Sequence, residues 1–167
     1  MANSKVFGYL MNCFWLLLPI LAFNLIFTRQ PPPAYQMDVF WKDIPKAISI
    51  PENLLRTLVM ILPVFMRLRV STPGQKLGLG LYVTGLLVYF ASWGALTAAP
   101  KSAWSIGAIG FLAPAFTPIL WLAGIGMIGD ELQLPRIPFK PWMYWTVSGL
   151  FLLFHNLHAF TVYSRGI

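Results

Sequence analysis

The chain alternates long uncharged runs with short polar segments. Residues 6–27, 77–99, 102–129 and 141–164 contain no Asp, Glu, Lys or Arg, and the shortest of these runs has 22 residues. A helix needs about 20 mainly apolar residues to cross the hydrocarbon layer of a membrane, which is about 30 Å thick. Each of the four runs therefore predicts a membrane-spanning helix.

A further span is predicted over residues 53–70, where the uncharged stretch is short. Only ten residues, Thr57 to Met66, separate Arg56 from Arg67. In a helix these two arginines share a face and lie about 16 Å apart along the axis. The segment spans if both side chains extend to opposite headgroup layers, and it is a re-entrant piece if they do not. We expect it to span. The prediction is thus an all-α bundle of five transmembrane helices, the second one short, in a single membrane domain over residues 1–167.

Composition supports a membrane protein. Hydrophobic residues make up 57% of the chain and charged residues 10%, whereas an ordinary soluble domain has about 25% charged residues. The mean hydropathy is +0.68. These values argue against a soluble fold and predict a multi-pass protein of a plasma membrane or bacterial inner membrane.

The charge is basic, with 12 Lys and Arg against 5 Asp and Glu, a net +7. The basic residues are spread along the loops, which predicts attraction to anionic lipids and not to nucleic acid. With five spans they divide evenly between the two sides, so the positive-inside rule gives little direction. Because Arg67, Arg69 and Lys76 share one short loop, we expect a cytoplasmic N-terminus.

Small residues on the third predicted helix indicate close helix packing. Gly78, Tyr82, Gly85 and Tyr89 recur at helical spacing, and Gly94 follows them. Glycines let helix backbones approach closely in lipid. The pattern is typical of a packing seam, and the alternative is a ligand groove lined by the two tyrosines.

The fourth predicted helix has glycines and prolines on one side: Gly107, Gly110, Pro114 and Pro118. The glycines predict helix packing, and each proline removes a backbone donor, so we expect a kink at Pro114 and Pro118. Helices that break at membrane depth often line a substrate or ion site. A merely kinked helix is the simpler interpretation.

The last predicted helix carries His155 and His158 on one face. The simplest interpretation is hydrogen bonding to Tyr, Ser or backbone groups of neighbouring helices.

A haem is disfavoured because two histidines on one face of one helix cannot bind both sides of it. A metal would need a partner ligand such as Asp38, Asp43 or Glu52 from the first long loop. A proton shuttle normally requires an acid buried within the spans, and the predicted spans contain none. We therefore predict no cofactor.

Two further polar groups are candidates for ligand binding. Asn53 and Arg56 begin the second predicted span, and guanidinium groups bind lipid phosphate well. Arg67 at the other end of that span is a similar candidate. Arginines that only extend to the headgroup layer would explain the same pattern.

The function that follows first from these features is a non-catalytic subunit or scaffold of a membrane complex. The short loops have no room for a soluble active site, and no nucleophile or nucleotide motif is present. Its glycine seams would pack against other membrane subunits or a second copy of the chain. The alternative is a lipid-handling membrane enzyme or small transporter, with a pocket near His155, His158, Arg56 and the kinked fourth helix.

Overall fold

The computed structural model describes residues 10–27, 31–133 and 139–166. Within these ranges the chain forms helices and connecting loops, with no strand beyond two isolated bridges. The all-helical prediction is confirmed. In the described residues, three helical segments are long and apolar enough to cross a membrane: Lys46–Phe65, Pro73–Ala98 and Ala108–Ile128.

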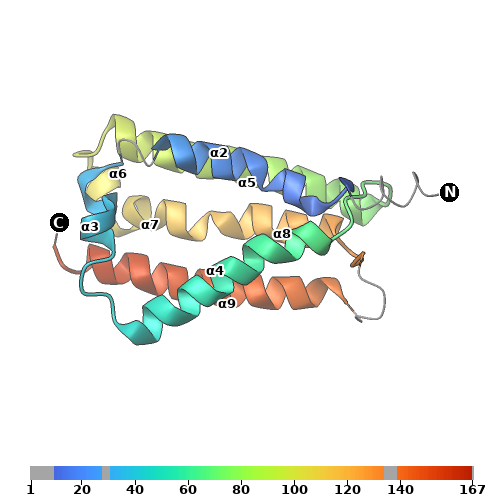
Figure 1. Ribbon diagram of the computed structural model, residues 1–167. Coiled ribbons are helices and arrows are strands. Elements are labelled where there is room, and N and C mark those ends of the chain that lie inside the picture. The colour runs from blue at the N-terminus through green and yellow to red at the C-terminus, as the bar shows by residue number, and fades with distance from the viewer. Residues whose placement is uncertain (1–9, 28–30, 134–138, 167) are drawn as a thin grey trace.

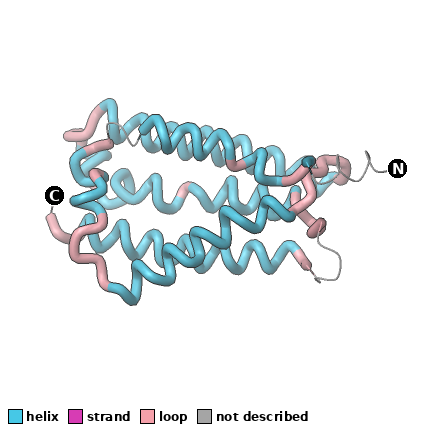
Figure 2. The backbone as a smooth tube through the Cα atoms, in the orientation of Figure 1, coloured by secondary structure: helices cyan, strands magenta, loops and turns pink. Residues whose placement is uncertain are grey.

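The longer helices lie side by side, with α7 and α8 following one another along one line (Figures 1 and 2). If this pair is taken as one, successive helices alternate in direction and their connections gather at the two ends of the bundle. In chain order they are α2 (Leu18–Phe27), α4 (Lys46–Phe65), α5 (Pro73–Ala98), α7 (Ala108–Phe116), α8 (Pro118–Ile128) and α9 (Pro141–Tyr163). Four short helices complete the described fold: η1 (Cys13–Leu16), η2 (Pro33–Tyr35), α3 (Met37–Phe40) and α6 (Ala103–Ile106).

The first helical segment is shorter than predicted. Residues 6–9 of the expected span lie outside the described residues, and the apolar segment runs from Cys13 to Phe27. The Asn12 side chain accepts a hydrogen bond from the backbone N–H of Phe14, which caps η1. Asn12 also pairs with Arg67 in an isolated bridge. The segment Cys13–Phe27 is therefore shorter than the roughly 20 residues that a straight span needs.

The second helix is displaced from its predicted position. It starts at Lys46 instead of residue 53 and ends at Phe65 instead of residue 70. Pro45, with φ −55°, precedes the first turn, where proline is well tolerated. Arg67 is not on the helix, because Met66 is already extended and the Arg67 N–H donates to the Glu131 carbonyl at 2.9 Å. The predicted pairing of Arg56 and Arg67 on one helix face is therefore wrong.

The third and last helices agree closely with the predicted runs. α5 begins at Pro73 because Thr72 and Gln75 form a capping box, in which each side chain binds the other residue's backbone N–H. α9 covers residues 141–163, one residue short of the prediction. It has the length of a span but is not among the three apolar ones, because it contains polar residues such as His155, Asn156 and His158.

The fourth predicted helix is interrupted twice. Gly107 is extended and separates α6 from α7, and Thr117 separates α7 from α8 immediately before Pro118. The Thr117 hydroxyl donates to the Ala113 carbonyl at 2.7 Å. Thr117 keeps a helical backbone, with φ −59° and ψ −26°, and residues 108–128 form one apolar segment, so the kink expected at Pro114 and Pro118 stays a prediction.

Glycines hold α5 against α8. A Cβ added to Gly78 would lie 2.6 Å from the Met127 Cβ, and one added to Gly85 would lie 2.5 Å from the Trp121 backbone nitrogen. Gly110 is equally crowded, by Trp104. Gly94 has no neighbour within 4 Å of such a Cβ, and at Gly107 the only neighbours are carbonyls of α6. Gly78 and Gly85 therefore lie where α5 packs against α8 of the same chain.

The loop between α2 and α4 closes one end of the bundle. Phe40 of α3 is buried in a cluster with Ala34, Phe111 and Ala159. Arg165, just after α9, donates to the carbonyls of Lys42 and Asp43 and ties this loop to the last helix. The loop thereby covers the residues described next.

Candidate functional site

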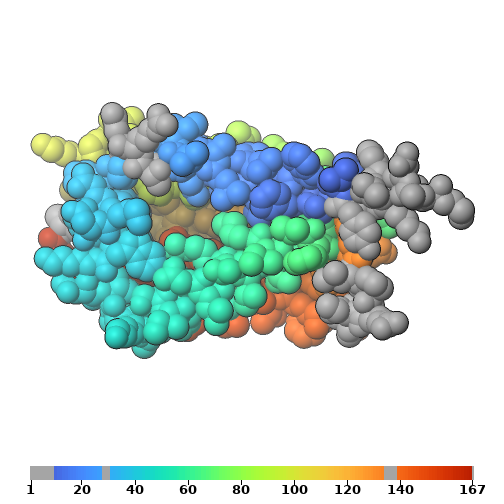
Figure 3. All heavy atoms as spheres, viewed as in Figure 1, coloured from blue at the N-terminus to red at the C-terminus, as the bar shows by residue number. Residues whose placement is uncertain are grey.

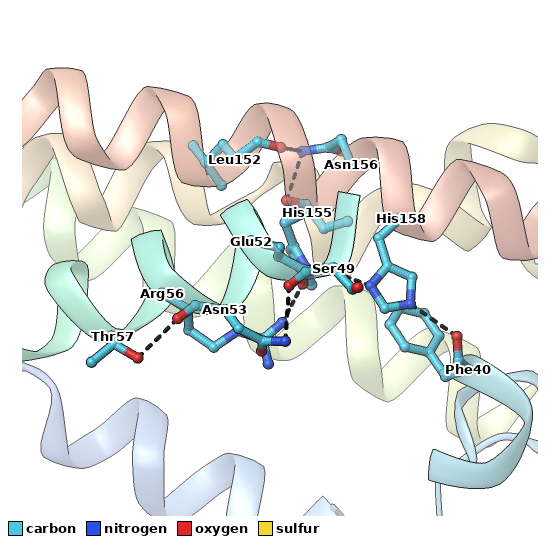
Figure 4. A network of polar contacts seen from close by, with 11 residues as sticks. Phe40, Ser49, Glu52, Asn53, Arg56, Thr57, Leu152, His155, Asn156 and His158 are labelled. Atoms are coloured by element: carbon cyan, nitrogen blue, oxygen red, sulfur yellow. Dashed lines mark hydrogen bonds and ion pairs between the residues drawn. The ribbon is translucent and has the colours of Figure 1, made fainter. Parts of the chain in front are cut away.

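A fully buried carboxylate lies at the centre of the site. Glu52 on α4 is 0% exposed. Its Oε1 accepts from Arg56 Nη2 and lies 2.9 Å from His155 Nδ1, and its Oε2 lies 2.6 Å from His158 Nδ1 (Figure 4). Glu52 therefore joins one arginine and two histidines.

Helix periodicity brings these four side chains together. Glu52 and Arg56 are four residues apart on α4, and the histidines are three apart on α9, so each pair shares a helix face. α4 and α9 pack along each other (Figure 1). The predicted shared face of the histidines is confirmed. The prediction that no acid lies within the spans is wrong, because Glu52 belongs to the apolar helix α4 and not to the loop before it.

His158 uses both ring nitrogens within the protein. Nδ1 faces Glu52, and Nε2 lies 2.9 Å from the Phe40 carbonyl oxygen. The ring is fully buried, stacks on Phe40 at 4.3 Å and meets Trp41 edge-on at 4.5 Å. His158 therefore connects the carboxylate to the loop that closes the bundle, and has no nitrogen left for a ligand.

His155 and Arg56 are more accessible. In His155 only Nδ1 contacts a polar group of the described residues, and its side chain is 21% exposed. The Arg56 side chain is 34% exposed, with its guanidinium 5.4 Å from the Trp41 ring centroid. Both side chains therefore combine a fixed contact to Glu52 with a free polar edge.

These free edges line a cavity of about 630 Å³ inside the bundle. The space-filling view shows a hollow between α2 and α4 on this side of the molecule (Figure 3). The lining comes from every long helix and the covering loop, and its main members are Asn24, Tyr35, Trp41, Arg56, Met60, Tyr89, Pro114, Pro118, Trp121, Phe151 and His155. A volume of about 300–1,000 Å³ is usual for a small-molecule site.

Two tryptophans of the cavity wall, Trp93 and Trp121, have a buried indole N–H without a hydrogen-bond partner in the described residues. Trp121 is 3% exposed, and its indole N–H has no hydrogen-bond partner in the described part of the chain. Such a group costs about 1–3 kcal/mol when it stays unpaired. The polar groups of the wall that remain partly exposed are those of Arg56 and His155, and Arg56 offers only donors to an oxygen atom in the cavity.

Two tyrosines of the wall are already paired. The Tyr89 hydroxyl donates to Asn24 Oδ1 at 2.7 Å, and the Tyr35 hydroxyl donates to the Phe111 carbonyl. Burial raises the pKa of Tyr35 above its usual range, so this hydroxyl stays protonated and keeps its bond. These residues shape the cavity and position its other side chains.

The predicted ligand-binding residues divide into two groups. Arg56, Tyr89 and His155 line the cavity, and His158 lies directly behind it. Tyr82 instead donates to the Leu16 carbonyl at 2.8 Å, and Asn53 donates to the Ser49 carbonyl at 2.9 Å. The last two are not part of the cavity wall.

The hydropathy pattern did not predict that Glu52 joins the two histidines or that Asn24 accepts a hydrogen bond from Tyr89. Glu52 was expected only as one of three loop carboxylates that could approach the histidines. The available signal was that Glu52 precedes Arg56 by four residues, so both lie on one helix face, while the histidine pair on the last helix needs a polar partner. For Asn24, the signal is an amide within an apolar run, which requires a partner in the bundle.

The site does not have the donor set of a metal or haem centre. Among the described residues, no group of three or more His, Cys, Asp or Glu side chains is arranged to hold a metal ion. Both nitrogens of His158 face oxygen atoms of the protein, which leaves only His155 Nε2 as a free histidine ligand. The distances of 2.9 and 2.6 Å between Glu52 and the two histidine Nδ1 atoms are those of direct hydrogen bonds.

Comparison with known proteins adds no functional assignment. No family model, no curated protein and no solved structure matches this chain. The function must therefore be argued from the site itself.

Proposed function

We propose that this chain is an integral membrane protein that binds an amphiphilic, lipid-like molecule in its central cavity. The observation that carries the proposal is the cavity wall, which holds the partly exposed Arg56 and His155 and also includes Trp121, whose buried indole N–H has no partner in the described residues. Such groups are costly inside an apolar bundle unless a ligand satisfies them. The activity that follows is handling of a lipid-like ligand, by binding or transport.

The wall also predicts the general form of the ligand. Arg56 supplies only donors, so it favours a headgroup with acceptor oxygens. Met60, Phe151 and the proline pair Pro114 and Pro118 supply an apolar surface suited to a hydrocarbon chain. The hollow between α2 and α4 gives such a molecule a lateral path from the membrane (Figure 3).

The topology proposed with this function has five spans. α2, α4, α5, the α7–α8 pair and α9 alternate in direction, as consecutive spans would. The N-terminus is placed in the cytoplasm because Arg67, Arg69 and Lys76 then form a basic cytoplasmic loop. The membrane is a plasma membrane or bacterial inner membrane, and anionic lipids surround the basic ends of the bundle.

Native mass spectrometry of the protein released from lipid nanodiscs tests the proposal. Wild-type protein should retain one amphiphile per chain. Arg56→Gln should reduce the retained fraction at least about tenfold, since a guanidinium bond to an anion or carbonyl contributes about 1.5–3 kcal/mol. Lys101→Gln is the matched control, because Lys101 lines a separate cavity at the end of the bundle.

Two results would contradict the proposal. Wild-type protein that carries no amphiphile after gentle release would mean that the cavity is not a lipid site. Equal loss in Arg56→Gln and Lys101→Gln would mean that general surface charge, and not the central cavity, retains the molecule.

A non-catalytic subunit is the second candidate, and one glycine favours it. Gly94 on α5 has open space where Gly78 and Gly85 are filled by α8, so a helix of another subunit or a second copy would fit closely there. Copurification of a stoichiometric partner that is lost in Gly94→Leu would support it. The central cavity requires no such partner.

A further inference from the structure

The contacts of His158 fix the number of hydrogens in the buried cluster. The Phe40 carbonyl oxygen can only accept a hydrogen bond, so His158 Nε2, 2.9 Å away, must carry a hydrogen. A hydrogen must also lie between His158 Nδ1 and Glu52 Oε2, which are 2.6 Å apart. It belongs either to the histidine or to the carboxyl group.

Both placements give the same charge. With the hydrogen on Nδ1, His158 is a cation and Glu52 an anion, and with the hydrogen on Oε2 both are neutral. His155 donates from Nδ1 to Glu52 Oε1 as a neutral ring in either case, and Arg56 is always positive. The smallest number of hydrogens that satisfies every contact thus leaves the cluster with one net positive charge.

No neighbouring acid balances this charge within the site. Asp38 of α3 also lines the cavity but is exposed, and no ion pair joins it to Arg56 or His155 in the described residues. The other titratable groups that face the cluster or its cavity are the neutral hydroxyls of Tyr35 and Tyr89. Arg165 lies at the loop that follows Phe40, where it donates to the backbone carbonyls of Lys42 and Asp43. Arg56, which is positive in both placements, is partly exposed and faces the cavity, so an anion bound there would balance this charge.

We infer that the central cavity binds a singly charged anion together with one proton, the proton being held between Glu52 and His158. This inference rests on the proposed function and specifies its ligand as an amphiphile with a monoanionic headgroup, such as a carboxylate. The anion sits against Arg56 and the free Nε2 edge of His155. The proton sits one layer deeper and never contacts the ligand.

Loss of the proton has two consequences. The cluster becomes neutral, so the attraction for the anion falls. His158 must also give up either its bond to Glu52 or its bond to Phe40, since one hydrogen cannot satisfy both acceptors. Anion affinity should therefore decrease as the pH rises, and the α3 loop that covers the cavity should loosen at the same time.

Binding of radiolabelled laurate to protein in phosphatidylcholine nanodiscs tests the inference, with empty nanodiscs subtracted. Laurate should bind at one site per chain, and its Kd should rise by up to about tenfold per pH unit once the proton is lost, because one proton is linked to binding. Uncharged dodecanol should compete at least about tenfold less well. Acetate should not compete if the anion must carry a lipid chain, whereas competition by acetate assigns the site to small free anions of the same charge.

Two substitutions separate the proton from the rest of the site. Glu52→Gln reproduces the hydrogen pattern of the protonated carboxyl, with its amide donating to His158 Nδ1, so it should bind laurate at the wild-type low-pH affinity across the whole range. His158→Asn keeps a donor toward Glu52 Oε2 but takes up no proton. It should show the weak high-pH affinity of the wild type throughout. His155→Asn, as a control, should bind more weakly and keep the pH dependence.

The outcomes distinguish this inference from the proposed function. Laurate and dodecanol could instead bind saturably with equal affinity at every pH. This result would support the lipid site but contradict the inference that the ligand is an anion whose binding is coupled to a proton. The same holds if Glu52→Gln or His158→Asn keeps the wild-type pH dependence. Failure of the wild type to bind either amphiphile would remove both proposals.

Discussion

At the residue scale, the molecule is organised around a charge that hydrophobic patterning does not anticipate. A lone carboxylate is expensive to bury, but Glu52 has an arginine and two histidines within hydrogen-bond distance, which offset that cost. The same contacts order α4 against α9. Removing the carboxylate should therefore affect both the stability of the bundle and its binding site.

Glu52→Ala leaves Arg56, His155 and His158 without their shared acceptor. We expect a loss of about 3–5 kcal/mol in the free energy of unfolding, the usual effect of breaking a buried ion pair. Glu52→Gln keeps the acceptor and a donor, so it should lose no more than about 1–2 kcal/mol. Thermal or denaturant unfolding in detergent measures both variants, and an equal loss in the two would show that the hydrogen-bond pattern contributes nothing.

The sequence reveals only part of this site. The facing histidines follow from their spacing, and Arg56 stands out as a cation near an apolar run. Glu52 was placed outside the span because charge normally marks where a span ends. Its burial depends on residues more than a hundred positions later in the chain, and local patterning carries no information on such pairs.

At the element scale, the bundle depends on helix contacts that small residues allow. α5 and α8 meet most closely at Gly78 and Gly85, where the space for a side chain is already filled. Elsewhere on α5 the same residue type faces open space, as at Gly94. Glycines of one helix therefore differ in their tolerance of a methyl group.

Alanine substitutions should separate these glycines. Gly78→Ala and Gly85→Ala should destabilise the protein by about 1–3 kcal/mol through overpacking against α8. Gly94→Ala should instead stabilise it by about 0.5–1 kcal/mol, since alanine favours the helix and meets no neighbour. Unfolding curves of the three variants in one detergent test this, and destabilisation by Gly94→Ala comparable with the other two would contradict the packing described for α5.

Helix existence was easier to predict than helix ends. The runs predicted over residues 77–99 and 141–164 are long and uncharged, and their limits fell close to those of α5 and α9. The Thr72-Pro-Gly-Gln75 capping box was a usable signal for the start of α5. The early start of α4 was hidden because Lys46 and Glu52 lower the local hydropathy, although Pro45 marks a suitable first turn.

At the scale of the whole molecule, an apolar exterior surrounds a polar centre. Large apolar side chains such as Leu58, Leu87 and Leu153 point outward and are 38%, 65% and 54% exposed. In water such a surface would drive aggregation, whereas lipid chains would cover it. The buried charges lie instead around the central cavity, as expected when the surrounding solvent is hydrocarbon.

The proposed five-span topology predicts which loops share a side of the membrane. In a Cys13→Ser background, single cysteines at Ser71, Lys101 and Ser164 can be labelled with an impermeant maleimide in sealed vesicles. Ser71 should react from one side, and Lys101 and Ser164 from the other. Because the ends of α5 lie at opposite ends of the bundle (Figure 1), reaction of Ser71 and Lys101 from the same side would exclude α5 as a span.

Photolabelling with a diazirine-bearing fatty acid, followed by peptide mapping, tests the central claim most directly. If the cavity takes up an amphiphile, the label should appear on cavity residues such as Met60, Trp121 and Phe151, and excess laurate should abolish it. Label confined to outward residues such as Leu87 and Leu153, and unaffected by laurate, would show that lipid only surrounds the protein and does not enter it.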